Sequence, residues 1–299
     1  MNQKVSFSHS VLLLTSAMIW GFAFVAQKEG MLYLGPFLFN ALRFLMGSLF
    51  LILIFFKQFK NMNKKILMAG IILGLVLFAA STFQQIGIVY TQAGNAGFIT
   101  SLYIVFIPII GLFYKRKTGF YIWFSIFMAI VGFSLMSLNF HTLKLSYGDL
   151  LVFIGSIFWA IHVSLIESYA QLNQSIVLAA TQFMVCGMLS LLIALSTEPV
   201  HIDAIKQAWL PVSFAGIFSA AVAFTLQIYA QRFVPANVAG VLFSSESLFA
   251  LWGGIMLLHE QFSIIQWLGA FFIFFAILFV QLYPSIIFTL KKVKHYGIH

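Results

Sequence analysis

Residues 236–260 read ANVAGVLFSSESLFALWGGIMLLHE, an apolar run long enough to cross a bilayer that carries one carboxylate, Glu246, near its middle. A charge at the centre of a bilayer costs roughly 2.5 to 3.5 kcal/mol, so such a group is kept where it faces other protein or water. Ser244, Ser245 and Ser247 are close enough in sequence to hydrogen-bond the carboxylate. We therefore expect Glu246 to have a function; the structural alternative is a protonated carboxyl group bonded within its own helix turn.

The rest of the chain is similarly apolar. Of its 299 residues, 62% are hydrophobic and only 8% are charged. A soluble fold would have to expose too much of this apolar surface to water, so a polytopic helical membrane protein is the class that remains. The net charge of +9 does not indicate nucleic-acid binding, because the cations lie in short segments between apolar runs. The single cysteine, Cys186, excludes an internal disulfide and a multi-cysteine metal site.

The hydropathy pattern predicts an all-α integral membrane protein with ten spans and no inserted soluble domain. The expected spans are 10–27, 35–56, 65–89, 93–114, 120–138, 148–169, 176–195, 209–231, 236–258 and 263–284. With the N-terminus inside, twelve of the sixteen Lys and Arg residues lie in inner segments and three lie in outer loops. The positive-inside rule then places both termini in the cytoplasm of a multi-pass protein of the cell inner membrane.

The two halves of the chain also resemble each other, at an offset of 139 residues for the first two spans and 143 for the next two. Matched positions include Trp20 with Trp159, Phe44 with Phe183, Gln84 with Gln227, Gly97 with Gly240 and Ser101 with Ser244. Ordered identities at a nearly constant offset indicate a duplication of five helices, residues 1–142 and 143–299. Because five is odd, the second copy crosses the membrane inverted, as in secondary transporters that bind solute between their repeats.

Three stretches are similar to one family: WGFAFVAQK at 20–28, GFITSLYIVFIPIIG at 97–111 and SSESLFALWGGIMLLHE at 244–260. Together with the five-plus-five layout they resemble the EamA-type transporters of the drug/metabolite transporter superfamily, over nearly the whole chain. The resemblance implies a central cavity surrounded by the first four helices of each repeat. It also implies transport, often export, of small polar metabolites such as amino acids or nucleobase-like compounds.

Two positions bear on helix geometry within this resemblance. The family often has a proline directly after the glutamate of the ninth helix, where this chain has Ser247. That proline would open the helix and free a carbonyl group. The fourth helix does contain a proline, Pro108, which removes one backbone hydrogen bond and predicts a kink.

A second charge within a predicted span, Arg43, lies at a depth similar to that of Glu246. At 1.5 Å per residue, Arg43 is about 12 Å below the outer edge and Glu246 about 15 Å from the inner edge of a core about 30 Å thick. The two could pair or could hold opposite ends of a zwitterion; alternatively, Arg43 is a structural ion pair or a clamp on carbonyl groups. Their repeat counterparts, Gln182 and Tyr103, are uncharged, as an asymmetric solute would require.

Other polar and aromatic side chains complete the predicted solute site. The polar candidates are Gln84, Asn95, Tyr103, Gln227 and Ser244, and the candidate apolar walls are Trp20 and Trp159. Each of them is individually as readily explained by contacts between helices. Glu246 is also the candidate for proton coupling, because burial disfavours its charged form whereas a nearby Arg43 would favour it.

No phosphate-binding glycine loop, His-Glu-x-x-His motif or nucleophile elbow occurs in the sequence. We therefore expect no cofactor and no metal, and transport driven by a gradient. The expected partners are a small solute and the lipid bilayer, with proton coupling and a homodimer left open. Two alternatives are an intramembrane enzyme that uses Glu246 and His162 as acid and base, and a membrane scaffold or sensor. Solute flux in liposomes distinguishes these functions.

The cation distribution makes the topology testable. Reporter proteins fused at the C-terminus and inserted at residue 203 should report the cytoplasm and the outside respectively, because the inner segments carry most of the Lys and Arg residues. The measurement is reporter activity in intact cells. The same compartment for both fusions would contradict the topology.

Overall fold

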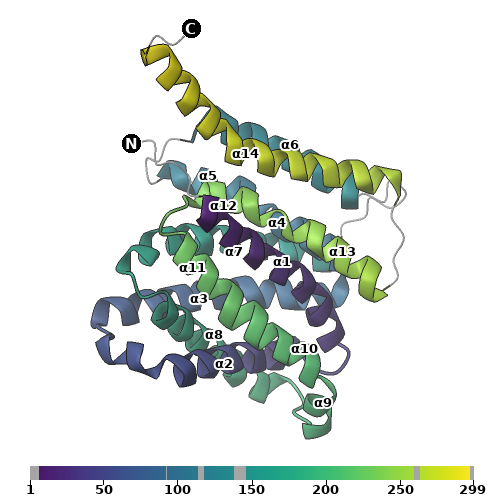
Figure 1. Cartoon of the computed structure of the whole chain (residues 1–299). Helices are drawn as coiled ribbons and strands as arrows, with labels where there is room; N and C mark the ends of the chain where they lie inside the picture. The colour runs from purple at the N-terminus through teal and green to yellow at the C-terminus, as the bar shows by residue number, and fades with distance from the viewer. Residues whose placement is uncertain (1–6, 92, 114–117, 138–145, 259–262, 297–299) are drawn as a thin grey trace.

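The computed structural model describes residues 7–91, 93–113, 118–137, 146–258 and 263–296, and all regular secondary structure in these ranges is helical (Figure 1). The first half contains α1 (Phe7–Gly30), α2 (Pro36–Phe55), η1 (Phe56–Asn61), α3 (Lys64–Tyr90), α4 (Ala93–Ser101), α5 (Tyr103–Phe113) and α6 (Phe120–Ser137). The second half contains α7 (Tyr147–Tyr169), η2 (Ala170–Leu172), α8 (Ser175–Thr197), α9 (Ile202–Gln207), α10 (Trp209–Ser213), η3 (Phe214–Phe224), α11 (Thr225–Ala230), α12 (Ala236–Phe243), α13 (Glu246–Leu258) and α14 (Ile264–Tyr296).

Six helical segments in the described part of the chain are long and apolar enough to cross a membrane. They are Phe7–Gly30, Pro36–Asn61, Lys64–Tyr90, Tyr147–Leu172, Ser175–Thr197 and Trp209–Ala230. Shorter apolar helices occur at Ile99–Phe113, Phe120–Gly132 and Trp267–Val280. The predicted all-helical membrane protein is therefore confirmed, while the count of ten spans in two inverted repeats stays a prediction.

The starts of several helices follow from local sequence. Pro36 is the first residue of α2, where its missing N–H would have had no partner in any case. Asn63 caps α3 by accepting a hydrogen bond from the backbone N–H of Ile66, at 3.0 Å. Ser146 and Asp149 form a reciprocal capping box at the start of α7.

The start of α2 is also capped from the other half of the chain. Glu198, which follows α8, accepts hydrogen bonds from the backbone N–H groups of Phe37 and Leu38, at 2.9 and 2.8 Å. A carboxylate at this position satisfies two otherwise unpaired donors and complements the helix dipole. A Cβ at Gly35 would overlap the Glu198 carboxyl group, so glycine permits this approach.

A second polar joint links the two halves at the same end of the bundle. The Thr91 hydroxyl donates a hydrogen bond to the Asp149 carboxylate at the start of α7. The Lys28 ammonium group, near the end of α1, donates to the carbonyl oxygens of Ile88 and Thr91 at 2.8 and 3.0 Å. The ends of α1 and α3 and the start of α7 are therefore tied together.

Helices from the two halves pack directly on one another, with α2 against α8, α3 against α7 and α8, and α6 against α14. Glycines allow some of these approaches: a Cβ at Gly74 would lie 2.8 Å from the Gln182 carbonyl oxygen, and one at Gly132 would lie 2.6 Å from that of Gly269. Small residues at such contacts let backbones approach closely. In Figure 1, α6 and α14 run together along one side of the molecule, as expected for peripheral helices.

The spans expected at 93–114 and 236–258 are each built from two helices, and hydropathy does not reveal this. The first is interrupted at Leu102, between α4 and α5, and the second at Ser244 and Ser245, between α12 and α13. Pro108 lies inside α5, so the interruption falls six residues before the position of the expected kink.

The interruptions arise from local competition for backbone groups. The N–H of Leu102 bonds the carbonyl three residues earlier rather than four, and the N–H of Ser245 does the same. The hydroxyl groups of Ser244 and Ser245 donate to the carbonyls of Val241 and Leu242, at 2.6 and 2.8 Å. Serine hydroxyls that bond the preceding turn in this way disturb a helix. Ser244 and Ser245 therefore interrupt the helix just before Glu246.

Candidate functional site

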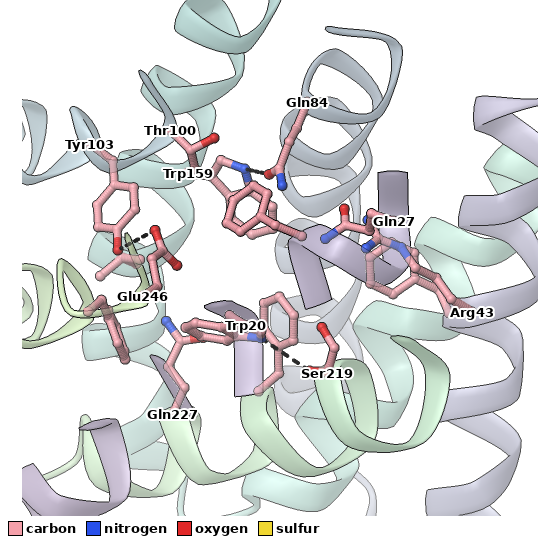
Figure 2. Close-up of a pocket in the computed structure, with 15 residues that line it drawn as sticks. Trp20, Gln27, Arg43, Gln84, Thr100, Tyr103, Trp159, Ser219, Gln227 and Glu246 are labelled. Carbon is pink, nitrogen blue, oxygen red and sulfur yellow. Dashed lines mark hydrogen bonds between the residues drawn. The ribbon is translucent and has the colours of Figure 1, made fainter. Parts of the chain in front are cut away.

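A cavity lies between the two halves, at the interrupted helices (Figure 2). Its volume is about 50 Å³. Ligand pockets typically measure roughly 300 to 1,000 Å³, so a solute of several heavy atoms would require the cavity to widen. Elements from α1 to α5 line it on the side of the first half, and α7, η3, α11, α12 and α13 line it on the side of the second.

Seven of the nine predicted site residues lie on this cavity. They are Trp20, Arg43, Gln84, Tyr103, Trp159, Gln227 and Glu246. Ser244 is buried but is not among the lining residues. The side chain of Asn95 lies outside the described residues.

Sequence reasoning missed eight further lining residues. They are Phe24, Gln27, Phe44, Thr100, Val163, Ser219, Phe224 and Phe243. Gln27 and Thr100 carried a usable signal, because each is a polar residue in a stretch that resembles the family. The apolar members carried none, because phenylalanines are spread throughout the chain.

Glu246 is the first residue of α13, and its side chain is only 4% exposed. One carboxylate oxygen accepts hydrogen bonds from the hydroxyl groups of Ser101, at 3.2 Å, and Tyr103, at 3.3 Å. Both donors flank the interruption between α4 and α5, in the other half of the chain. The carboxylate therefore joins the two interruptions to each other. Tyr103 is also the residue of the first half that is equivalent to Glu246 at the offset of 143 residues.

The prediction that neighbouring serines hydrogen-bond Glu246 is wrong. Ser244, Ser245 and Ser247 each donate to a backbone carbonyl three residues earlier, at 2.6 to 2.8 Å. Their hydroxyl groups are committed to the interruption of the helix, so a more distant segment supplies the donors.

Arg43 lines the cavity from α2 and is 5% exposed. Its guanidinium carbon lies 4.5 Å from the ring centroid of Phe44 and 5.7 Å from that of Phe39, distances typical of cation–π contacts. Its buried Nε has no hydrogen-bond partner, and no ion pair joins Arg43 to Glu246 in the described part of the chain. Arg43 and Glu246 therefore do not form the direct ion pair that was one of the two arrangements considered for them.

Two tryptophans lie between the charged side chains in Figure 2. Trp20 packs against Phe224 and Phe243, with ring centroids 4.8 and 5.2 Å apart. Its indole N–H donates to the carbonyl of Ser219, in the wide π-helical segment η3, at 3.2 Å. The indole N–H of Trp159 donates to the side-chain oxygen of Gln84. Because both N–H groups are bonded, the rings are held as apolar walls.

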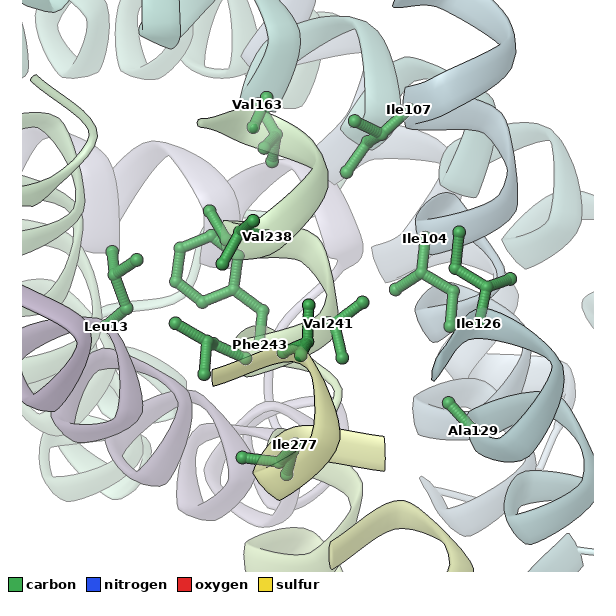
Figure 3. Packing of buried hydrophobic residues seen from close by; sticks show 14 of the residues in the cluster. Leu13, Ile104, Ile107, Ile126, Ala129, Val163, Val238, Val241, Phe243 and Ile277 are labelled. Carbon is green, nitrogen blue, oxygen red and sulfur yellow. The ribbon is translucent and has the colours of Figure 1, made fainter. Parts of the chain in front are cut away.

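An apolar cluster of buried side chains packs next to the cavity (Figure 3). Phe243 and Val163, which line the cavity, belong to this cluster together with Leu13, Val238 and Val241. All five side chains are at most 4% exposed. Close packing of this kind resists displacement of single side chains, so widening of the cavity requires whole helices to move.

His162 is not a partner of Glu246 at this site. Its Nε2 lies 2.8 Å from the side-chain oxygen of Gln182, and neither residue lines the cavity. Among the residues that the structure describes, no three His, Cys, Asp or Glu side chains group as they would around a metal ion.

The sequence profile of the EamA-like transporter family matches residues 8–138 and again residues 146–282. The chain belongs to the EamA-like transporter family. This EamA-like protein is 32% identical over 272 residues to an uncharacterized transporter of Archaeoglobus fulgidus, covering 89% of this chain and 83% of the relative. It is 24% identical to the uncharacterized transporter YoaV of Bacillus subtilis, covering 87% of this chain and 92% of YoaV.

One solved crystal structure superposes with a TM-score of 0.79, at 16% identity, and covers 94% of this chain and 98% of its own. This likeness shows a shared fold. The family match and the relatives make the protein a multi-pass transmembrane transporter, for which a small-molecule solute and a lipid environment follow.

The absence of a side chain at Gly21 allows α1 to pack closely on α13 at Glu246. A Cβ at Gly21 would lie 2.6 Å from the Glu246 carbonyl oxygen, whereas a Cβ at Gly97 would meet only Phe24, at 4.0 Å. Gly21→Ala should therefore separate α1 from α13 and destabilise the transporter by about 1 to 3 kcal/mol. Gly97→Ala, the control, should be neutral or slightly stabilising. Thermal unfolding midpoints check this, and equal midpoints for the two variants would contradict the close approach.

Proposed function

We propose that the protein is a secondary transporter that exports small polar metabolites, with zwitterions such as amino acids as the leading solutes. One observation carries the proposal: a buried guanidinium, whose Nε has no hydrogen-bond partner in the described part of the chain, and a buried carboxylate line the same cavity, on opposite sides of it in Figure 2. Burying unpaired charges is costly unless a ligand or partner compensates them. A solute with a carboxylate and an ammonium group compensates both.

The proposed architecture is ten spans in two inverted repeats, residues 1–142 and 143–299. It is supported by the two successive family matches and by the interruptions of two helices at positions about 143 residues apart. Interrupted helices near the midplane, one from each repeat, are a recurrent feature of solute sites in secondary transporters. The aromatic and polar groups on the cavity extend the same site: Trp20, Trp159, Gln84, Tyr103 and Gln227.

Alternating access is supported by the small volume of the cavity. It is also supported by the different hydrogen bonds that join the halves at the two ends of the bundle. At the end where α2 begins, Glu198 caps α2 and Asp149 bonds Thr91. At the opposite end, the side-chain amide of Gln174 donates a hydrogen bond to the carbonyl oxygen of Asn61 in the other half, at 3.3 Å. We propose that the charged joints close the outer side, with both termini in the cytoplasm and the protein in the cell inner membrane.

Catalysis is not part of this proposal. The acid and base considered for an intramembrane enzyme, Glu246 and His162, do not share the cavity, since His162 does not line it and is hydrogen-bonded to Gln182. Transport needs only that the cavity bind a solute and open to each side in turn.

Neutral substitutions of the two charged side chains test the site. Arg43→Gln and Glu246→Gln should each lower solute flux at least tenfold, because each removes a charged contact worth more than about 1.4 kcal/mol. The measurement is uptake of labelled amino acids and nucleobases into proteoliposomes. Arg232→Gln and Glu29→Gln, which alter charges away from the cavity, are matched controls. Normal flux in Glu246→Gln would mean that the carboxylate is structural.

Coupling to protons is proposed to run through Glu246. Ser101 and Tyr103 donate to its carboxylate, whereas burial disfavours the charged form. A solute ammonium group would then replace a proton on the same side chain, which links the two movements. If Arg43 instead keeps Glu246 ionised, the protein is an exchanger or facilitator.

Imposing a pH gradient separates these cases. Solute flux into proteoliposomes at a fixed solute gradient should change when a pH gradient is imposed, and Glu246→Gln should abolish that dependence. Wild-type flux that ignores the pH gradient would reject proton coupling through this carboxylate.

A further inference from the structure

Two glutamines on the cavity occupy equivalent positions in the two halves of the chain. Gln84, on α3, and Gln227, on α11, are related by the offset of 143 residues. A side-chain amide has a hydrogen-bond donor end and an acceptor end, so each glutamine can present either end to a solute. Which end it presents depends on what holds the other.

Gln84 is held through its oxygen. The indole N–H of Trp159 can only donate a hydrogen bond, and it donates to the Gln84 oxygen. The NH₂ group of Gln84 makes no hydrogen bond to the described part of the chain. Gln84 therefore presents a donor to the cavity.

Gln227 is held through its NH₂ group, by way of a residue that does not line the cavity. The backbone carbonyl of Val163 can only accept, and the Gln231 NH₂ group donates to it at 3.1 Å. The Gln231 oxygen is thereby turned toward Gln227, whose NH₂ group donates to it at 2.9 Å. The Gln227 oxygen is buried and has no partner in the described part of the chain, so it is the end of this amide that is left to accept from a solute when the cavity widens.

Both amides are thus oriented from α7, by groups four residues apart. Trp159 offers a donor to Gln84, and Val163 offers an acceptor to Gln231 one helical turn later. The equivalent glutamines consequently have opposite polarity. Gln227 and Glu246 lie on the same side of the cavity in Figure 2.

We propose that Gln231 is a positioning residue of the transport site, which keeps the amide oxygen of Gln227 turned toward a hydrogen-bond-donating end of the solute. The inference rests on the proposed function, because the solute group that uses this oxygen is the ammonium group of a zwitterion. Its N–H groups bond Gln227 and Glu246, while its carboxylate accepts from Gln84 and Arg43. Gln231 is 1% exposed and acts without touching the solute.

Pairs of probes that keep the positive charge but replace the N–H groups by N-methyl groups test this directly, because the comparison is made between variants within each pair. The probes are glycine with glycine betaine, L-leucine with N,N,N-trimethyl-L-leucine, and L-phenylalanine with N,N,N-trimethyl-L-phenylalanine. Dissociation constants are measured by calorimetry on the purified full chain in nanodiscs. The readout is the ratio of the two constants within a pair, which a general loss of stability does not change.

Three variants separate positioning from a structural role. Gln231→Met removes both hydrogen bonds, so the Gln227 amide is free to turn. Gln231→Glu still accepts from Gln227 but, when ionised, cannot donate to Val163. Gln171→Met is the matched control, because Gln171 also donates to a backbone carbonyl, at 3.2 Å, but is exposed and away from the cavity.

The wild type should bind the unmethylated probe at least tenfold more tightly in at least one pair. Gln231→Met should reduce that ratio by roughly tenfold, whereas Gln231→Glu and Gln171→Met should leave it within about twofold. An unchanged ratio in Gln231→Met, or an equal fall in Gln231→Glu, would overturn the inference and leave Gln231 with a structural role.

Two further outcomes are decisive. If Gln231→Met does not fold, Gln231→Lys replaces it, because lysine donates to Val163 but cannot accept from Gln227. The Gln227 amide should then reverse, and the ratio of the two dissociation constants should again fall. An unchanged ratio would overturn the inference. If the wild type binds neither member of any pair, the proposed zwitterion function fails and the inference fails with it. Discrimination by the wild type together with an unchanged ratio in the variants refutes the inference alone.

Discussion

The arrangement of the whole cavity depends on one constraint, the burial of the Glu246 carboxylate in an apolar bundle. A carboxylate in such surroundings needs donors, and two hydroxyl groups from the other half of the chain provide them. Those donors, Ser101 and Tyr103, flank one interrupted helix, and Glu246 begins the helix that follows the other interruption. The contact therefore holds the two interruptions together, and the space between them is the cavity.

The family profile matches the two halves of the chain in succession, yet the chemistry differs between the halves. The positions of Tyr103 and Glu246 are equivalent, as are those of Arg43 and Gln182, yet in each pair one residue is charged and the other is neutral. Gln84 and Gln227 are identical in type but differ in polarity, because α7 offers a donor to one and, through Gln231, an acceptor to the other. The cavity between the two halves thus has unlike sides, which suits an asymmetric solute.

Much of this was predictable from residue type alone. Charges in apolar runs identified Arg43 and Glu246, and the internal offset aligned the halves, because both features are written along the chain. The interrupted helices were not predictable from hydropathy, since Ser244 and Ser245 act through hydroxyl groups that bond carbonyls, a geometry with no hydropathic signal. The partners of Glu246 and the role proposed for Gln231 depend on contacts distant in sequence, which no local pattern contains.

The central claim is that the space between the halves is a solute site reached from both sides of the membrane. A single cysteine tests it most directly, with Thr100→Cys on the cavity and Cys186→Ser to remove the native thiol. A membrane-impermeant thiol reagent should label this cysteine in right-side-out vesicles, where it reaches the outer face, and also in inverted vesicles, where it reaches the cytoplasmic face. A transported solute should slow the labelling in both. Labelling from one side only, or labelling that solute does not affect, would contradict the account.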